Sequence, residues 1–238
     1  KIVPLKLDSR KSTENSRAIL ALTSMGLDAS DIGGYDLTGA LSDMTYVKKQ
    51  GINGPIFALI ALDSGNYEIK PLASGTAKTQ VTREKLVTYI LDNELKNGGF
   101  CLSGTSPDPD VTAMALQALA PYYKGSTDVS EQVRGQVTEA VNRGICVLSE
   151  IQNEDGTYSS WGTKNAESTA QVLVALSSLG LDGDTDVRFI KNGHSVLDGL
   201  EQFYLTGKGA FEHVASDGGN QMATEQAFYA LVSYDRYK

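Results

Sequence analysis

The sequence predicts an all-α protein in which one pair of helices is repeated along the chain, and three observations support this prediction. An uncharged helical block recurs five times, helices with charged faces alternate with it, and a turn that joins glycine to an aromatic residue recurs with a similar period. No segment between these features has a convincing strand pattern. A chain that repeats one buried helix at a nearly fixed step is typical of a repeat architecture.

The recurring block is clearest between Ser168 and Leu181, where no residue carries a charge. An uncharged helix in a globular chain is usually buried on every side. The block repeats at steps of 40, 57, 57 and 55 residues, around Ala21, Ala61, Ala118, Ala175 and Ala230. We therefore predict five buried helices, over residues 14–25, 55–63, 109–120, 166–179 and 221–234. The third has Asp108 as its cap and Pro109 in its first turn, and should end before Pro121.

Helices with one charged face are expected between the buried ones, over residues 36–49, 81–96, 130–152 and 192–205. In the second of these, Leu86 and Ile90 recur at helical spacing among charged residues. Gly135 and Gly144 weaken the third helix, so we expect it to bend. The long irregular segment 64–80 is predicted to be a surface loop.

The turns that leave three of the charged helices share one pattern, in which an aromatic residue stands two places after a glycine. They read Gly98-Gly99-Phe100, Gly156-Thr157-Tyr158 and Gly209-Ala210-Phe211. Glycine permits a tight reversal after a helix. We expect the aromatic ring to fasten each turn onto its neighbours.

Bulk composition limits the possible function classes. A chain of 238 residues with 41% hydrophobic content can bury a substantial core, and its net charge of −8 argues against a nucleic-acid or anionic-membrane surface. No apolar run is long enough for a membrane span. Because the chain begins at Lys1 without methionine, we expect an excised piece of a longer protein, forming a single domain over residues 1–238. Cys101 and Cys146 are expected to be separate thiols.

The alternation of helices and the three glycine-aromatic turns resemble the α/α toroid superfamily. This superfamily includes squalene and terpene cyclases, protein prenyltransferase β subunits, and the helical domain of intrinsic factor and transcobalamin. The strings Asn53–Leu59, Glu167–Gln171 and Met222–Ala227 are similar to prenyltransferase-like domains of Gram-positive cell-surface proteins.

The resemblance implies an α/α toroid of inner and outer helices, in a secreted or surface-anchored bacterial protein. A closed toroid of this superfamily has six inner helices. Since we count five, we expect an open or incomplete ring. The relation to intrinsic factor makes a corrinoid-like ligand one possibility, and no other cofactor is expected.

In such a toroid the N-terminal ends of the inner helices point toward one mouth of a central cavity. Alignment on the repeated alanines places one ring at Asn53, Asp110, Glu167 and Met222, the next at Pro55, Thr112, Thr169 and Thr224, and a third at Phe57, Met114, Gln171 and Gln226, with Glu225 beside it. A polar rim above a partly aromatic interior suits an amphipathic ligand. The competing interpretation is that these polar residues only cap first helical turns.

An enzymatic alternative rests on the segment Asp108–Ala113, which resembles the Asp-x-Asp-Asp-Thr-Ala motif of class II terpene cyclases. The resemblance implies that Asp110 is the acid that protonates an alkene or epoxide, with Glu225 as a second candidate. Val111 stands where the last aspartate of the motif belongs. A prenyltransferase needs Asp, Cys and His zinc ligands on inner-helix ends, and this pattern is absent.

Two further features receive a structural interpretation. The segment Asp182-Gly183-Asp184-Thr185-Asp186 begins like a calcium loop, but its twelfth position is Gly193, so we expect a solvated turn and no metal site. Trp161 is expected to pack against its turn, with stacking on a ligand as the alternative.

We expect a non-catalytic domain that binds a bulky or amphipathic small molecule in its cavity, or another extracellular domain. Nucleic acid and membrane insertion are not expected. The candidate ligand-binding residues are Asn53, Phe57, Asp110, Trp161, Glu167, Gln171, Glu225, Gln226 and Tyr229.

Overall fold

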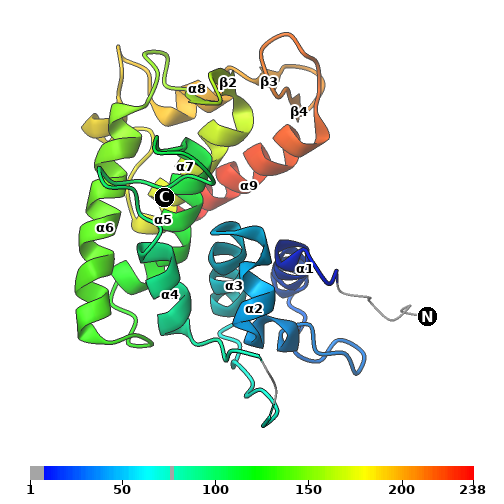
Figure 1. Ribbon diagram of the computed structural model, residues 1–238. Helices are drawn as coiled ribbons and strands as arrows, with labels where there is room; N and C mark the ends of the chain where they lie inside the picture. The colour runs from blue at the N-terminus through cyan, green and yellow to red at the C-terminus, as the bar shows by residue number, and fades with distance from the viewer. Residues whose placement is uncertain (1–7, 76–77) are drawn as a thin grey trace. The chain divides into compact units, whose positions relative to one another are not determined.

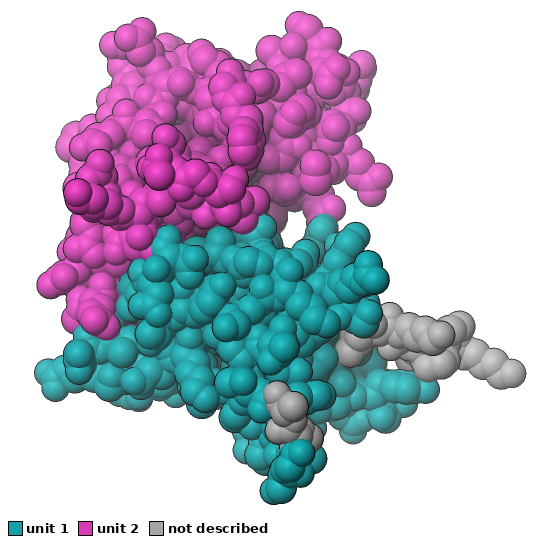
Figure 2. Space-filling model, viewed as in Figure 1, with its two compact units in different colours: residues 1–93, 127–134 teal, residues 94–126, 135–238 magenta. Residues whose placement is uncertain are grey.

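A computed structural model describes residues 8–75 and 78–238 of the chain (Figure 1). The described part contains nine α-helices, three short 3-10 helices and four short strands, so the prediction of a helical protein is confirmed. None of the helices in this part is long and apolar enough to cross a bilayer. The chain divides into two compact units, residues 1–93 with 127–134 and residues 94–126 with 135–238 (Figure 2).

The first unit is organised around α3 (Asn53–Ser64), which packs against α1 (Ser12–Ser24) and α4 (Arg83–Leu91). Its repeat alanine, Ala61, is fully buried. Gly54 lets the first turn of α3 approach the preceding segment closely, because a Cβ atom there would lie 1.8 Å from the carbonyl oxygen of Val47. The first unit also contains the short α2 (Met44–Val47) and the 3-10 helices Gly39–Ser42 and Lys48–Gln50.

The prediction that the first helical block is buried on every side is wrong. α1 buries only Ser12, Asn15, Ser16 and Ile19, and its repeat alanine is exposed. Within the unit, α3 is its principal helical neighbour. One neighbouring helix covers one face, so the opposite face of α1 remains in contact with water.

The predicted helix over residues 36–49 is also absent as a single element. Oδ1 of Asp36 accepts hydrogen bonds from the backbone N–H groups of Thr38 and Gly39, and Oδ1 of Asp43 accepts one from Thr45. Such local side-chain bonds to the backbone compete with continuous helical bonding. The segment is therefore divided into short helical turns.

The second unit has α7 (Ala166–Leu179) between α5 (Pro109–Tyr123) and α9 (Gln221–Tyr237), which both pack against it (Figure 1). Every residue of α7 except Gln171 and Ser178 is buried. The bounds predicted for this helix are confirmed. Its end is fixed by Gly180, which adopts the left-handed conformation with a φ of +80°.

The remaining helices of the second unit are α6 (Glu131–Glu150), of which residues 135–150 belong here, and α8 (Val196–Glu201). α6 is a continuous helix despite its two glycines. Gly144 permits a close approach to α5, because a Cβ atom there would lie 2.8 Å from Cδ2 of Leu116. This glycine therefore serves packing between helices.

Several predicted element ends are wrong. α5 continues through Pro121 to Tyr123, where the buried Tyr122 anchors the last turn, and α4 and α8 are much shorter than predicted. Four strands were not predicted: β1 (Tyr158–Ser160) pairs antiparallel with β2 (Thr163–Asn165), and β3 (Tyr204–Leu205) pairs with β4 (Ala210–Phe211). These hairpins occupy the connections that lead into α7 and α9.

α9 is the second helix whose predicted burial is wrong. Its buried residues are Ala223, Ala227, Ala230 and Tyr234, which form the stripe facing α7. The large apolar side chains Met222, Phe228, Tyr229 and Val232 are exposed. The repeated Ala-Leu block thus predicts helical structure correctly here without predicting how much of the helix is covered.

Candidate functional site

A recurrent hydrogen bond fastens the three glycine-aromatic turns of the second unit to the starts of α5, α7 and α9. The backbone N–H of Phe100 donates to Oγ1 of Thr112 at 2.9 Å. The equivalent bonds run from Tyr158 to Thr169 at 3.1 Å and from Phe211 to Thr224 at 2.9 Å. All three aromatic rings are buried, so the predicted fastening of the turns is confirmed. The three aligned threonines, Thr112, Thr169 and Thr224, therefore have a structural role, because they hold these turns in place.

The same three helices begin with a polar cap. Oδ1 of Asp108, Asn165 and Asn220 accepts a hydrogen bond from the backbone N–H three residues further on. Two residues after each cap stand Asp110, Glu167 and Met222, in the ring that the sequence alignment predicted. Because capping is provided by Asp108 and Asn165, the side chains of Asp110 and Glu167 are not needed to cap their helices.

A buried carboxyl cluster forms around these two residues. Oε2 of Glu167 lies 2.7 Å from Nδ1 of His213, and Glu167 is 8% exposed. Three buried atoms in this cluster have no hydrogen-bond partner: Oδ1 of Asp110, Oε1 of Glu167 and Oγ of Ser168. A buried polar atom without a partner is costly, so a group of them marks a place where a further polar group would be stabilising.

The electrostatics of Asp110 are strongly perturbed. Burial, followed by the negative charge of Asp108, raises the pKa of Asp110 to about 6, and the charge of Glu167 acts in the same direction. The nearby Ser168 hydroxyl and His213 lower the pKa, but do not offset the rise. Asp110 therefore exchanges its proton near neutral pH.

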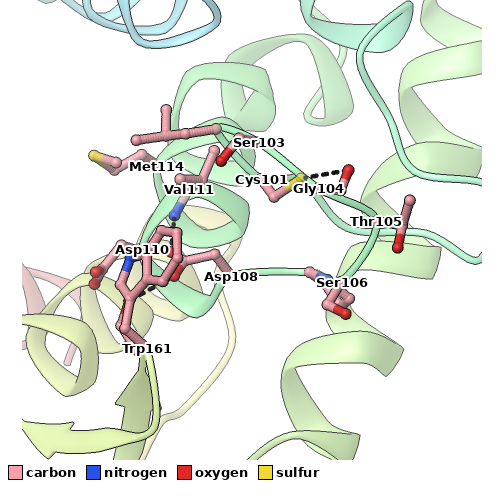
Figure 3. Close-up of a pocket in the computed structure, with 13 residues that line it drawn as sticks. Cys101, Ser103, Gly104, Thr105, Ser106, Asp108, Asp110, Val111, Met114 and Trp161 are labelled. Carbon is pink, nitrogen blue, oxygen red and sulfur yellow. Dashed lines mark hydrogen bonds between the residues drawn. The ribbon is translucent and has the colours of Figure 1, made fainter.

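Asp110 also lines the Trp161 pocket, a cavity of about 440 Å³ formed by residues 101–108, the first turns of α5 and the β1–β2 hairpin (Figure 3). The side chains of Val111, Met114 and Leu102 supply apolar surface, while Asp108 and Asp110 supply carboxylates. Oδ2 of Asp108 accepts a hydrogen bond from Oγ of Ser160 at 2.5 Å, which connects the pocket floor to β1.

Trp161 stands at the tip of the β1–β2 hairpin and is 86% exposed. Its φ of +52° and that of Gly162, +79°, form a two-residue hairpin turn in which positive φ is required twice. A bulky residue rarely adopts this backbone conformation, and such outliers concentrate at functional sites. The expected packing of Trp161 against its turn is wrong, since the ring contributes to the pocket wall and faces water.

A row of glutamine amides joins α5, α7 and α9. Nε2 of Gln117 donates to Oε1 of Gln171 at 2.9 Å, and Nε2 of Gln171 donates to Oε1 of Gln226 at 3.0 Å. Asp110, Met114 and Gln117 follow one another at helical spacing on one face of α5. The amide row thus lies on the helix face that also borders the pocket.

The remaining predicted site residues lie elsewhere. Asn53 and Phe57 belong to α3 in the first unit, where Oδ1 of Asn53 is buried without a partner. Glu225 and Tyr229 are exposed on α9. The structure therefore brings Asp110 and Trp161 together at the pocket, places Glu167 in the adjoining carboxyl cluster, and joins Gln171 to Gln226.

Sequence reasoning missed three contributors to the site: Gln117, Ser160 and His213. Ser160 and His213 each stand two residues after the aromatic residue of a turn. Ser160 contacts a carboxylate at the start of α5, and His213 contacts one at the start of α7. Extending the turn alignment by two positions would have found both. Gln117 sits in the repeated Ala-Leu block but one helical turn from the aligned position.

The carboxylates of the acidic segment after α7 already have partners within the protein. Oδ2 of Asp182 pairs with Nζ of Lys238, Asp184 accepts a hydrogen bond from Ser195, and Asp186 pairs with Arg188. A calcium ion would have to displace these partners. The described residues contain no group of three or more His, Cys, Asp or Glu side chains placed to hold a metal ion. Cys101 and Cys146 are both free thiols.

No family model and no curated protein matches this sequence. The assignment of the site therefore depends on its geometry and chemistry.

Proposed function

We propose that this chain is a non-catalytic ligand-binding domain of a secreted or surface-anchored bacterial protein, and that the Trp161 pocket receives the ligand. The observation that supports the proposal is the exposed indole of Trp161, held in an unfavourable backbone conformation at the wall of a pocket with a carboxyl floor. Burying such a ring against a ligand would remove apolar surface from water.

The proposal includes the α/α toroid arrangement, with the inner helices bordering a cavity. Its support is the repetition of the turn, cap and threonine bond at the start of α5, α7 and α9, and the polar face that the glutamine row forms across them. Small-angle scattering of the intact chain would test the arrangement. A profile that requires two separated bodies in solution would exclude a common ring.

The enzymatic alternative is supported by one observation, the raised pKa of Asp110, since an acid catalyst must retain its proton near neutral pH. Two features oppose it. Val111 occupies the position of the third motif aspartate, and the pocket wall includes an almost fully exposed tryptophan. Protonation of an alkene creates a carbocation, which a site open to water would quench. Glu225, exposed on α9, has no such enclosed environment.

The proposed function is tested by capture of a ligand. The purified chain is incubated with a metabolite extract, recovered, and its bound small molecules are identified by mass spectrometry. A corrinoid would be recognised by its visible absorbance. We expect a compound to be retained by the native chain and by Phe228→Ala, a variant at an exposed aromatic of α9, and to be lost from Trp161→Ala. Repeated recovery of nothing, or retention by Trp161→Ala, would overturn the proposal.

A further inference from the structure

We infer that the ligand of the Trp161 pocket is an organic cation. Its ammonium group pairs with the carboxylate of Asp110, and its apolar chain lies against Met114 and the Trp161 indole. This inference rests on the proposed ligand-binding function and narrows it to one chemical class. Three features of the described site support it, namely its uncompensated negative charge, its exposed aromatic face and its apolar wall.

The charge at the pocket floor is negative and has few cationic partners. Asp108 and Asp110 line the pocket, and none of the described residues lining it is a lysine, arginine or histidine. Behind Asp110 lies Glu167, which pairs with His213 through one oxygen and leaves the other buried without a partner. A ligand cation would stabilise ionised carboxylates that the protein itself leaves poorly neutralised.

The buried polar atoms around Asp110 support the same conclusion. Ser168 is fully buried, and its hydroxyl lies close enough to Asp110 to interact with that carboxyl and lower its pKa. The Asp110 Oδ1 atom is itself buried without a partner. A donor bound to the carboxyl from the pocket side would hold Asp110 ionised, and its buried oxygen could then accept the Ser168 hydroxyl hydrogen.

The aromatic and apolar walls define the rest of the ligand. An ammonium group near the face of an exposed indole gains a cation–π attraction, which is strongest for tryptophan among the aromatic side chains. Met114 is an adaptable apolar side chain that suits a flexible hydrocarbon. A ligand with a cationic end and an apolar chain matches this arrangement, whereas an anion would be repelled by Asp108 and Asp110.

The inference is tested with three probes of equal chain length: n-hexylammonium, hexyltrimethylammonium and n-hexanol. Because Trp161 is the one tryptophan of the chain, its fluorescence reports binding at the pocket directly. We expect both cations to bind at least tenfold more tightly than the alcohol at pH 8. We also expect their affinity to fall as the pH is lowered through about 6, where Asp110 takes up a proton. The pKa of Asp110 is raised by the charges of Asp108 and Glu167 and lowered by that of His213.

Matched variants show which residues bind the cation. Their affinities are measured by calorimetry, because the Trp161 variants lack the fluorescent indole. Asp110→Asn should weaken both cations about tenfold and leave n-hexanol unchanged. Glu201→Gln, which removes an exposed carboxylate of α8, should change neither. Trp161→Phe should retain more cation affinity than Trp161→Ala. Thermal melts of each variant establish that the fold is intact.

The outcomes separate this inference from the proposed function. Equal binding of n-hexanol and the cations, or cation binding that Asp110→Asn leaves unchanged, overturns the inference while leaving a ligand pocket in place. Absence of cation binding also overturns it. If the capture experiment likewise recovers nothing, the proposed function falls as well.

Discussion

α7 and α9 begin in the same way and end in different surroundings. Each follows a hairpin, has an asparagine cap, and accepts the backbone N–H of a buried aromatic through a threonine. Yet α7 is buried along almost its whole length, whereas α9 exposes Phe228, Tyr229 and Val232. Within the second unit α7 packs against both α5 and α9, while α9 packs chiefly against α7.

The comparison shows that the start of a helix and its burial depend on different parts of the sequence. The start of each helix is determined by residues within about one turn, through capping and local hydrogen bonds. Burial depends on how many other elements pack around the helix, which the residues of that helix do not specify. Three predictions test this separation, in order of decreasing effect.

Truncation of core side chains should give the largest difference between the two helices. Leu173→Ala in α7 removes a fully buried side chain and should lower the free energy of unfolding by about 4 kcal/mol. Val232→Ala in α9, at a position 44% exposed, should lower it by less than about 0.5 kcal/mol. Urea denaturation measures both. Equal losses would mean that the exposed face of α9 is covered in solution.

The carboxyl at the start of α5 should give a pH-dependent effect of about 3 kcal/mol. Burial and the charge of Asp108 raise the pKa of Asp110 from 3.8 to about 6, so folding favours its protonated form. This contribution to stability is complete below pH 4 and is lost as the pH rises through 6. Relative to the native chain, Asp110→Asn should therefore be more stabilising at pH 8 than at pH 4.

The control for this prediction is the aligned position of α9. Met222→Asp introduces a carboxyl in an exposed first turn, where it should change stability by only a few tenths of a kcal/mol in favour of the helix. Urea titrations at pH 4 and pH 8 provide both values. A difference between Asp110→Asn and the native chain that does not vary with pH would show that Asp110 is not strongly perturbed.

Loss of the turn-fastening hydrogen bond should give the smallest effect, and a graded one. Thr169→Val leaves the buried N–H of Tyr158 without an acceptor and should lower the free energy of unfolding by about 2 kcal/mol. Thr224→Val should cost about 0.5 kcal/mol, because Thr224 is partly exposed and water can replace its oxygen. Calorimetric melts measure the pair; the reverse order would contradict the burial difference.

The sequence predicted well the features that depend on neighbouring residues. Asp108 and Pro109 open α5 as expected, and α7 has the predicted bounds, because caps and a left-handed Gly180 act locally. The sequence predicted poorly where residues that favour a turn lie inside a segment with helical periodicity. Asn192 and Gly193 both have positive φ, so the helix predicted over residues 192–205 begins only at Val196, with Ser195 as its cap.

The candidate site was predictable in part. Alignment of the repeats placed Asp110 and Glu167 in one ring and paired Gln171 with Gln226, which are hydrogen-bonded. The exposure of Trp161 was not predictable from alignment, because it results from the conformation of a two-residue turn that the alternating helical pattern does not describe. The contact of His213 with Glu167 joins residues 46 positions apart and required the folded chain.

The threonine bond that recurs at each junction has an evolutionary consequence. A stretch from one cap to the next, such as Asp108 to Lys164, carries half of each joint: Thr112 near its start accepts the bond of the preceding turn, and Tyr158 near its end donates to the threonine of the next helix. Such a cassette can be duplicated or deleted as a whole without redesigning its joints. Copy number, rather than individual substitution, then becomes the simplest route by which the number of such helices could change in evolution.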